Sequence, residues 1–293
     1  MNMRKMIFKS SISEGREIPT DASNTDFDST DFEPLPWDKY FDTVVDTKID
    51  SSTFIRSYII GQGASSGPIF ICHHGAGNSG LSFGVMASSL AKNYPKGGFT
   101  IVAYDCRGHG GSQTANDANL SLNILSDDLI NLFNKLFPDN KRDVYLIGHS
   151  MGGGVVSKVA ADRRIPSVSG LAIIDVVEGS AIESLAFMQG YIHTRPQEFD
   201  SIPKAIEWHL KSGTIKNQES AKLSVPSFLK KSSNNEGVRY QWAVDLEQTS
   251  PFWEEWYRGM SSRFLNTPAG KLLILAGTDR LDKELMIGQM QGK

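Results

Sequence analysis

The sequence predicts an α/β fold built on a mostly parallel sheet with helices on both faces. From residue 69 onward, short apolar runs alternate with longer helical patterns, which is typical of a covered parallel sheet. One apolar run, Val144 to Ile147, leads directly into Gly148-His-Ser-Met-Gly152 and then into small residues that suit a helix. With 293 residues, of which 40% are hydrophobic, the chain can bury one substantial core. We therefore expect one α/β domain with an insertion.

The elements follow in order along the chain. Residues 44–49 and 53–60 alternate apolar and polar side chains and contain β-branched residues, which predicts two opening antiparallel strands. Further strands are expected at residues 69–73, 99–104, 144–147, 171–174 and 272–276, and helices at 81–93, 122–137 and 151–161. The fold class is α/β, with the sheet lacking a final strand.

Four regions are expected from these patterns. Residues 1–33 form a disordered leader because they offer few large apolar groups. Residues 34–179 are the first part of the core, 180–265 an inserted cap, and 266–293 a truncated continuation of the core. Helical stretches in the cap are expected at residues 180–191, 203–211 and 252–259, and its aromatic residues are many for a surface loop. Residues 230–237 are polar and predict a mobile loop.

Composition excludes several classes of function. A net charge of −3 offers no basic field for nucleic acid or an anionic membrane, and no apolar run reaches the ~18 residues of a spanning helix. The two cysteines, Cys72 and Cys106, predict buried thiols of a reducing compartment. No histidine and carboxylate grouping has metal-ligand spacing, and no cofactor is expected. Cap cations Arg195, Lys204 and Lys211 predict a solvated face, although one could hold a substrate carboxylate.

The Gly148-to-Gly152 segment has the G-x-S-x-G pattern in the context that a nucleophile elbow requires. Gly148 and Gly152 flank Ser150 because a tight strand-to-helix turn leaves no room for Cβ atoms beside the serine. Such elbows are typical of the α/β-hydrolase fold. Ser150 is therefore the expected nucleophile.

A nucleophilic serine needs a base, an oriented acid and donors for the oxyanion. Asp175 and Asp279 each follow a predicted core strand, and position alone does not choose between them as the acid. The oxyanion donors are expected to be the backbone N–H groups of Met151, which follows the serine, and of Ala76 in the His74-Gly-Ala-Gly77 loop.

The histidines supply no obvious base. The chain holds six, His73, His74, His109, His149, His193 and His209, and none follows His209. In this fold the catalytic histidine follows the last strand. Arg107 and His109, in the Asp105-to-Ser112 loop, are expected to fix backbone carbonyls. His74 and His149 are expected to point away from the serine, and His193 and His209 to be surface or packing residues.

Five further segments between residues 34 and 293 are distinctive. They are Pro34-Leu-Pro-Trp-Asp-Lys-Tyr-Phe41, His73-His-Gly-Ala-Gly-Asn-Ser-Gly80, Ile174-Asp-Val-Val-Glu-Gly179, Ala205-Ile-Glu-Trp-His209 and Leu281-Asp-Lys-Glu-Leu-Met-Ile-Gly-Gln-Met-Gln-Gly-Lys293. With these segments and the elbow, residues 34–293 resemble the protein phosphatase methylesterases, serine hydrolases that demethylate the C-terminal leucine of the protein phosphatase 2A catalytic subunit.

The resemblance implies that Asp175 is the acid and that the partner is the protein phosphatase 2A catalytic subunit, in the cytoplasm or nucleus. Family members continue into a further strand and a Gly-His segment that bears the catalytic histidine. We therefore expect a truncated chain that is nearly inactive as written, since losing that histidine costs on the order of 10⁶ in turnover. A non-catalytic phosphatase-binding paralogue and a small-molecule esterase or lipase are the alternatives.

Overall fold

The computed structural model describes residues 32–94, 98–234, 237–276 and 281–293. Residues 1–31 of the predicted leader therefore lie outside the described residues. Phe32, counted in that leader, is buried among apolar side chains of residues 199–228. Packing thus begins slightly before the predicted boundary.

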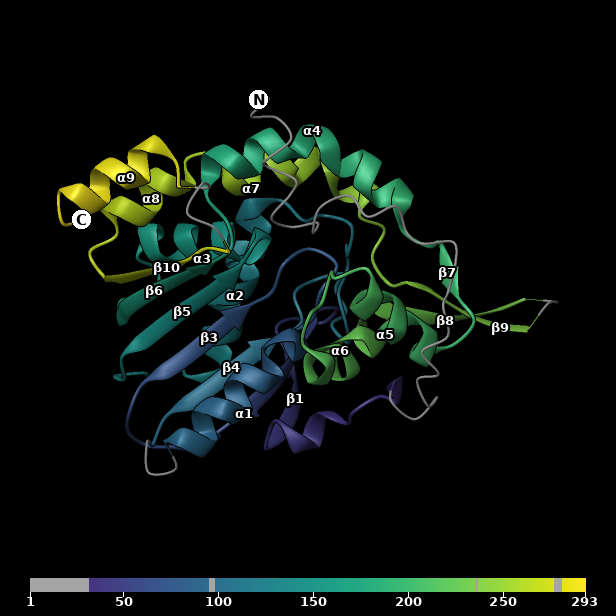
Figure 1. Ribbon diagram of the computed structural model, residues 1–293. Helices are drawn as coiled ribbons and strands as arrows, with labels where there is room; N and C mark the ends of the chain where they lie inside the picture. The colour runs from purple at the N-terminus through teal and green to yellow at the C-terminus, as the bar shows by residue number, and fades with distance from the viewer. Residues whose placement is uncertain (1–31, 95–97, 235–236, 277–280) are drawn as a thin grey trace.

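A seven-stranded sheet forms the centre of the molecule, in the order β1-β2-β4-β3-β5-β6-β10 (Figure 1). Its strands are β1 Thr43–Lys48, β2 Phe54–Ile60, β3 Ile69–His73, β4 Thr100–Tyr104, β5 Val144–His149, β6 Val168–Ile174 and β10 Gly270–Ile274. β2 pairs antiparallel with β1 and β4, and every other neighbouring pair is parallel. The predicted mostly parallel sheet is confirmed, and the carboxyl ends of its parallel strands meet at one edge.

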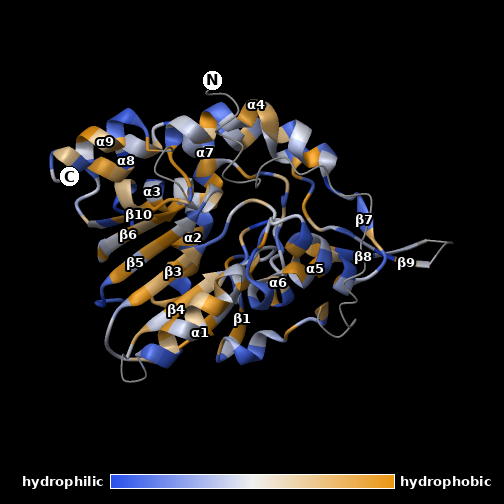
Figure 2. Ribbon diagram, viewed as in Figure 1, coloured by the Kyte–Doolittle hydropathy of each residue, from blue (hydrophilic) through white to orange (hydrophobic). Residues whose placement is uncertain are grey.

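Helices cover both faces of this sheet. The helices are α1 Gly84–Asn93, α2 Leu122–Leu136, α3 Met151–Asp162, α4 Glu178–Thr194, α5 Ile202–Lys211, α6 Gln218–Ser224, α7 Trp253–Tyr257, α8 Met260–Asn266 and α9 Lys283–Met290. Side chains of β4 alternate between two cores: Val102 and Tyr104 pack in the cluster that includes α2 and α3, whereas Ile101 and Ala103 pack in the cluster that includes α1. Figure 2 shows hydrophobic residues along the strands.

One predicted helix is divided. The apolar pattern of residues 81–93 begins as a 3₁₀-helix, Gly80–Phe83, and becomes α1 only at Gly84. A Cβ at Gly84 would lie 2.4 Å from a methyl carbon of Leu223. The first residue of α1 therefore packs closely against α6.

Residues 180–265, which we call the cap segment, contain most of α4, all of α5 to α7, and α8 except its last residue. They also contain a three-stranded sheet, β7-β9-β8. The predicted mobile loop over residues 230–237 is wrong for its described part, because β8 (Leu229–Asn234) and β9 (Gly237–Trp242) pair antiparallel. Residues 235 and 236 of that prediction lie outside the described residues. Polar side chains did not prevent pairing, because backbone hydrogen bonds hold this exposed hairpin and β7 (Glu198–Phe199) pairs with its other side.

The α7 end of the cap segment is bound tightly to the core. Glu255 Oε1 accepts the N–H of Leu122 at the start of α2 (2.7 Å), and Trp256 Nε1 donates to the Leu120 carbonyl (2.8 Å). A Cβ at Gly154 of α3 would lie 2.1 Å from the Trp256 carbonyl oxygen. In the described parts of the chain, no helix is long and apolar enough to cross a membrane.

Candidate active site

Ser150 occupies a strained turn between β5 and α3. Its φ is 51° and its ψ is −119°, a region that a residue with a Cβ rarely adopts. A Cβ at Gly148 would lie 2.3 Å from the Gly152 carbonyl oxygen, and one at Gly152 would lie 2.2 Å from the His73 carbonyl oxygen. Both flanking glycines are therefore required by backbone contacts, as the elbow pattern predicts.

The loop after β3 lies directly beside the serine. A Cβ built at Gly75 would be 3.2 Å from the Ser150 Cβ. Within the described residues, neither the N–H of Ala76 nor that of Met151 has a hydrogen-bond acceptor. The two backbone donors are thus available to a bound group near Ser150, as an oxyanion hole requires.

Two histidines hold this loop in place. His74 Nε2 accepts the N–H of Cys106 (3.0 Å), so its Nδ1–H donates to the Gly75 carbonyl (2.8 Å). His109 Nε2 accepts the N–H of Gly77 (2.9 Å), so its Nδ1–H donates to the Arg107 carbonyl (2.9 Å). Burial lowers the pKa of His74 far below its usual range and that of His109 to about 4. Both imidazole rings are therefore neutral and hold the two loops together by hydrogen bonds to backbone groups, as predicted for His109.

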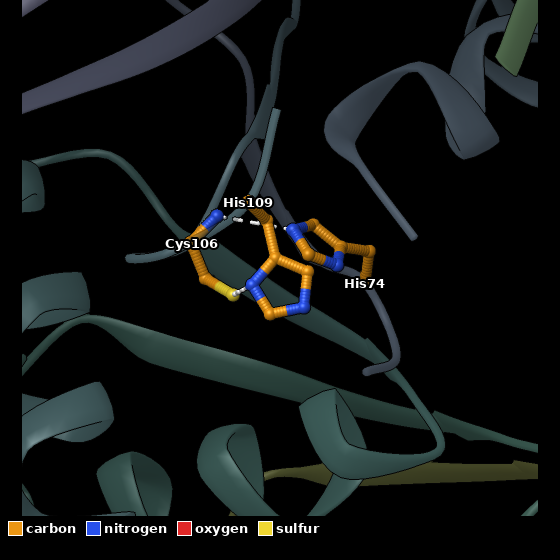
Figure 3. Close-up of side chains that lie close together, drawn as sticks. All are labelled: His74, Cys106 and His109. Atoms are coloured by element: carbon orange, nitrogen blue, oxygen red, sulfur yellow. Dashed lines mark hydrogen bonds between the residues drawn. The ribbon is translucent and has the colours of Figure 1, made fainter. Parts of the chain in front are cut away.

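His74, Cys106 and His109 also form a compact group whose ligand atoms lie within 4.8 Å of one another (Figure 3). Cys106 Sγ is 3.2 Å from His109 Nδ1, and burial raises the pKa of this thiol far above its usual range. A metal ion would have to take both imidazole lone pairs from backbone N–H groups and ionise the thiol. The bonding therefore fits a brace between two loops better than a metal centre.

The loop after β4 is fixed by buried charge. Asp105 accepts the N–H groups of Gly80 and Gly111 (both 2.8 Å), although burial raises its pKa to about 6. Arg107 binds both carboxylate oxygens of Asp128 at 2.6 and 2.7 Å and donates to the Asn116 carbonyl. Neither side chain contacts Ser150, so the predicted structural role of Arg107 is confirmed.

Asp175 follows β6, the strand next to the serine strand. Its φ is 55°, its N–H donates to the Ile274 carbonyl (2.7 Å) and its Oδ1 accepts the N–H of Ala276 (3.2 Å). The N–H of Ser150 donates to the carbonyl of Ile174, the residue before Asp175. The serine and this carboxylate therefore emerge side by side from adjacent strand ends. Asp279, the alternative acid, lies outside the described residues.

None of the six histidines makes a hydrogen bond to the Ser150 hydroxyl. His149 is largely buried, and burial lowers its pKa while the Asp175 carboxylate partly opposes that shift. His193 is exposed, and His209 is buried in the cap segment, as predicted.

Tyr257, at the end of α7, is a site residue that the sequence did not reveal. Its hydroxyl lies 3.3 Å from Ser150 Oγ, and the ring is buried. Burial raises the pKa of Tyr257, so the phenol stays protonated and can share its proton with the serine oxygen. The contact joins positions 107 residues apart, and only the presence of aromatic residues in the predicted cap pointed toward it.

Comparison with known proteins agrees with this geometry. A model of the alpha/beta hydrolase family matches residues 70–293. The chain is 43% identical to a protein phosphatase methylesterase 1 of Gibberella zeae over 89% of this chain and 67% of that protein. It is 36% identical to the protein phosphatase methylesterase 1 of Mus musculus over 90% of this chain and 78% of that protein. This chain belongs to the protein phosphatase methylesterase family.

Solved structures support the same fold. An E-2-(acetamidomethylene)succinate hydrolase superposes with a TM-score of 0.62 over 84% of this chain and 87% of its own, at 19% identity. That identity supports the fold alone. The chain spans about two thirds of the length of the fungal methylesterases, 65% in the case of Aspergillus oryzae.

Proposed function

We propose that this chain is a serine carboxylesterase that removes the methyl ester from the C-terminal leucine of the protein phosphatase 2A catalytic subunit. The observation that carries the proposal is the strained Ser150 turn with two unpaired backbone N–H groups beside it. Family membership supports the methyl ester as the substrate class, because the relatives are named protein phosphatase methylesterases. A cytoplasmic or nuclear place of action is part of the same proposal.

The proposed reaction begins when Ser150 Oγ attacks the ester carbonyl carbon. The carbonyl oxygen gains negative charge and is bound by the N–H groups of Ala76 and Met151, whose fixed positions cost no reorganisation. The C–O bond to the methoxy group then breaks and methanol leaves, so that an acyl ester forms on Ser150. Water attacks that ester, which frees the leucine carboxylate and restores the hydroxyl.

The proton transfers of this scheme need an imidazole oriented by Asp175. None of the six histidines is hydrogen-bonded to the Ser150 hydroxyl, and the Tyr257 hydroxyl lies beside that oxygen. A phenol of raised pKa is a poor base at neutral pH. Loss of a triad histidine lowers turnover by a factor on the order of 10⁶. We therefore expect slow turnover from these 293 residues when no other imidazole reaches Ser150.

The test is methanol release from methylated phosphatase catalytic subunit, with and without imidazole added as an external base. Added imidazole should raise release by the wild-type chain and should not raise release by the Ser150→Ala variant. Equal release from both proteins would refute Ser150 as the nucleophile. Release of acid from acyl glycerols, with none from the phosphatase, would support a small-molecule esterase instead.

A second candidate function is phosphatase binding without turnover, which the lack of a histidine at Ser150 favours. In that case the chain captures the phosphatase and protects its methyl ester. Imidazole would then leave methanol release at the background level, even when binding is saturated. The same experiment therefore separates the two functions.

The proposal also divides the chain into functional parts. Residues 34–179 and 266–293 would build the sheet and the elbow, and the cap segment would shape the entrance for the phosphatase tail. Aromatic packing in the cap segment and its contact to Ser150 through Tyr257 support this division.

A further inference from the structure

Two arginines of the cap segment, Arg195 and Arg263, have no carboxylate within 4.0 Å among the described residues. Arg263 is satisfied in another way, because it donates to Ser157 Oγ and to the backbone carbonyls of Arg258 and Trp256. Lys204 pairs with Asp200, Lys211 with Glu207, and Arg239 with both Glu198 and Asp200. These ion pairs are the solvated face that the sequence predicts. Arg195 makes no such pair within 4.0 Å.

Arg195 is half-buried, and its guanidinium makes no hydrogen bond to any described residue. Its Nε is shielded from solvent and has no acceptor. Burial lowers the pKa of Arg195, and the Asp245 carboxylate opposes that shift without forming an ion pair within 4.0 Å. Asp245 is already occupied, because it accepts the N–H groups of Glu247 and Gln248. A buried donor group left unpaired in this way is costly.

The guanidinium is nevertheless held in one place. It stacks on the Trp242 ring at 4.3 Å from the ring centre, and Trp242 Nε1 donates to the carbonyl of Pro196, the residue after Arg195. Trp242 itself packs edge-on against Phe199, Trp208 and His209. The N–H donors of the planar Arg195 guanidinium are therefore oriented before a ligand binds.

A second unpaired nitrogen lies in the same cluster. His209 is 7% exposed, its Nδ1 bonds the Thr214 hydroxyl at 2.8 Å, and its Nε2 is buried with no partner. The charge of Arg195 acts on this ring and, together with burial, keeps it neutral. The cluster thus carries one positive charge to which no carboxylate is hydrogen-bonded among the described residues.

We propose that Arg195, stacked on Trp242, binds a carboxylate side chain of the protein substrate. A single guanidinium fork matches a carboxylate in charge and in bidentate geometry, whereas a phosphate dianion would require a further unpaired cation. This inference rests on the proposed function, because it names how the cap segment recognises the phosphatase.

The position of Arg195 sets the kind of partner. It directly follows α4, whose 17 residues begin three positions after Asp175, so it lies roughly 25 Å along that helix from the site. An extended chain needs about seven residues to span this distance. A small ester cannot reach both places, but a protein with an acidic residue upstream of its C-terminus, or on its surface, can.

The first test compares the affinity of the phosphatase catalytic subunit for the wild-type chain and for the Arg195→Met variant. Methionine keeps an apolar stem on Trp242 and removes the charge, and we expect binding to weaken about tenfold or more. Lys204→Met and Lys211→Met, in which the lost charge was already paired, should bind within about twofold of wild type. Thermal unfolding of each variant shows whether the cap segment is still folded.

The second test observes Arg195 directly by nuclear magnetic resonance of its Nε–H group, assigned by its loss in Arg195→Lys. A short peptide of alternating glycine and glutamate should shift this signal, and the glutamine counterpart should not. If wild type captures no phosphatase, the proposed function fails and the peptide titration alone decides the inference. The proposal that Arg195 binds a carboxylate is overturned if the Arg195→Met variant binds the phosphatase as tightly as wild type. It is also overturned if the Nε–H signal responds in the same way to both peptides.

Discussion

The Gly152→Ala substitution tests whether the elbow and the loop after β3 are packed as described. The new Cβ would lie 2.2 Å from the His73 carbonyl oxygen and 2.8 Å from that of His74, and both are backbone atoms that cannot rotate away. Forcing such a group into a packed site costs about 1–3 kcal/mol. Because both contacts are rigid, we expect a cost near the upper end, about 3 kcal/mol, against a gain of about 1 kcal/mol in helix propensity.

The net loss of about 2 kcal/mol should lower the unfolding temperature by roughly 4–8 °C in a domain of this size. Gly190→Ala is a matched control, since Gly190 also lies inside a helix, α4, but a Cβ there meets no atom within 4 Å. That variant should unfold about 2–4 °C above wild type.

Thermal unfolding followed by circular dichroism measures both variants under the same conditions. A Gly152→Ala protein that is as stable as wild type would show that the loop does not contact α3 as described. In the expected case, a fluorophosphonate probe should also label Ser150 more slowly, because a displacement of ~1 Å at the amide donors costs about 10²-fold in rate.

Three further outcomes are expected. Ser150→Gly should raise the free energy of unfolding by about 1–3 kcal/mol, because glycine adopts a φ of 51° without strain, while fluorophosphonate labelling is lost; a less stable variant would contradict the strain. Arg107→Met should lower the free energy of unfolding by about 3–5 kcal/mol, because Asp128 remains buried without a partner. Lys158→Met, at an exposed ion pair, should change the free energy of unfolding by less than about 1 kcal/mol. The free energy of unfolding, measured in urea, should fall between pH 6.5 and 4. Buried histidines whose folded pKa is about 4 stay neutral in the folded protein while the unfolded chain binds protons, and each one lowers the stability by about 3 kcal/mol. Asp105, whose folded pKa is raised to about 6, offsets about as much as one of these histidines. These histidines are His73, His109 and His209. A midpoint that stays constant over this range would contradict the burial of neutral imidazoles.

The sequence predicted the elements whose signals are local. The run of residues 69–73 matches β3 at both ends, because apolar residues suited to a buried central strand are bounded by turn residues. The β8–β9 hairpin was missed because β8 is polar after Leu229, although Val238, Tyr240 and Trp242 alternate with polar residues in β9. The 3₁₀ turn before α1 was missed because an apolar pattern of this length does not distinguish a 3₁₀ turn from the first turn of an α-helix.

In the candidate site, too, residues in local motifs were predictable and contacts between distant segments were not. Ser150, Met151 and Ala76 were predictable because each belongs to a short motif whose geometry is fixed by neighbouring glycines. Their arrangement in space agrees with that prediction, and their catalytic roles stay a proposal. The contacts of Tyr257 with Ser150 and of His109 with Gly77 were not predictable, because they join segments far apart in the sequence.

The attachment of α7 to the core determines how a protein tail can reach the serine. Swinging the whole cap segment outward would break the Glu255 and Trp256 hydrogen bonds and pull the backbone of Trp256 away from Gly154 of α3. That end of the cap segment is therefore fixed to the core. The α6 part is attached as well, because Leu223 packs against Gly84 of α1 and the Tyr40 hydroxyl donates to Glu219. A substrate tail would have to reach Ser150 while both attachments stay in place.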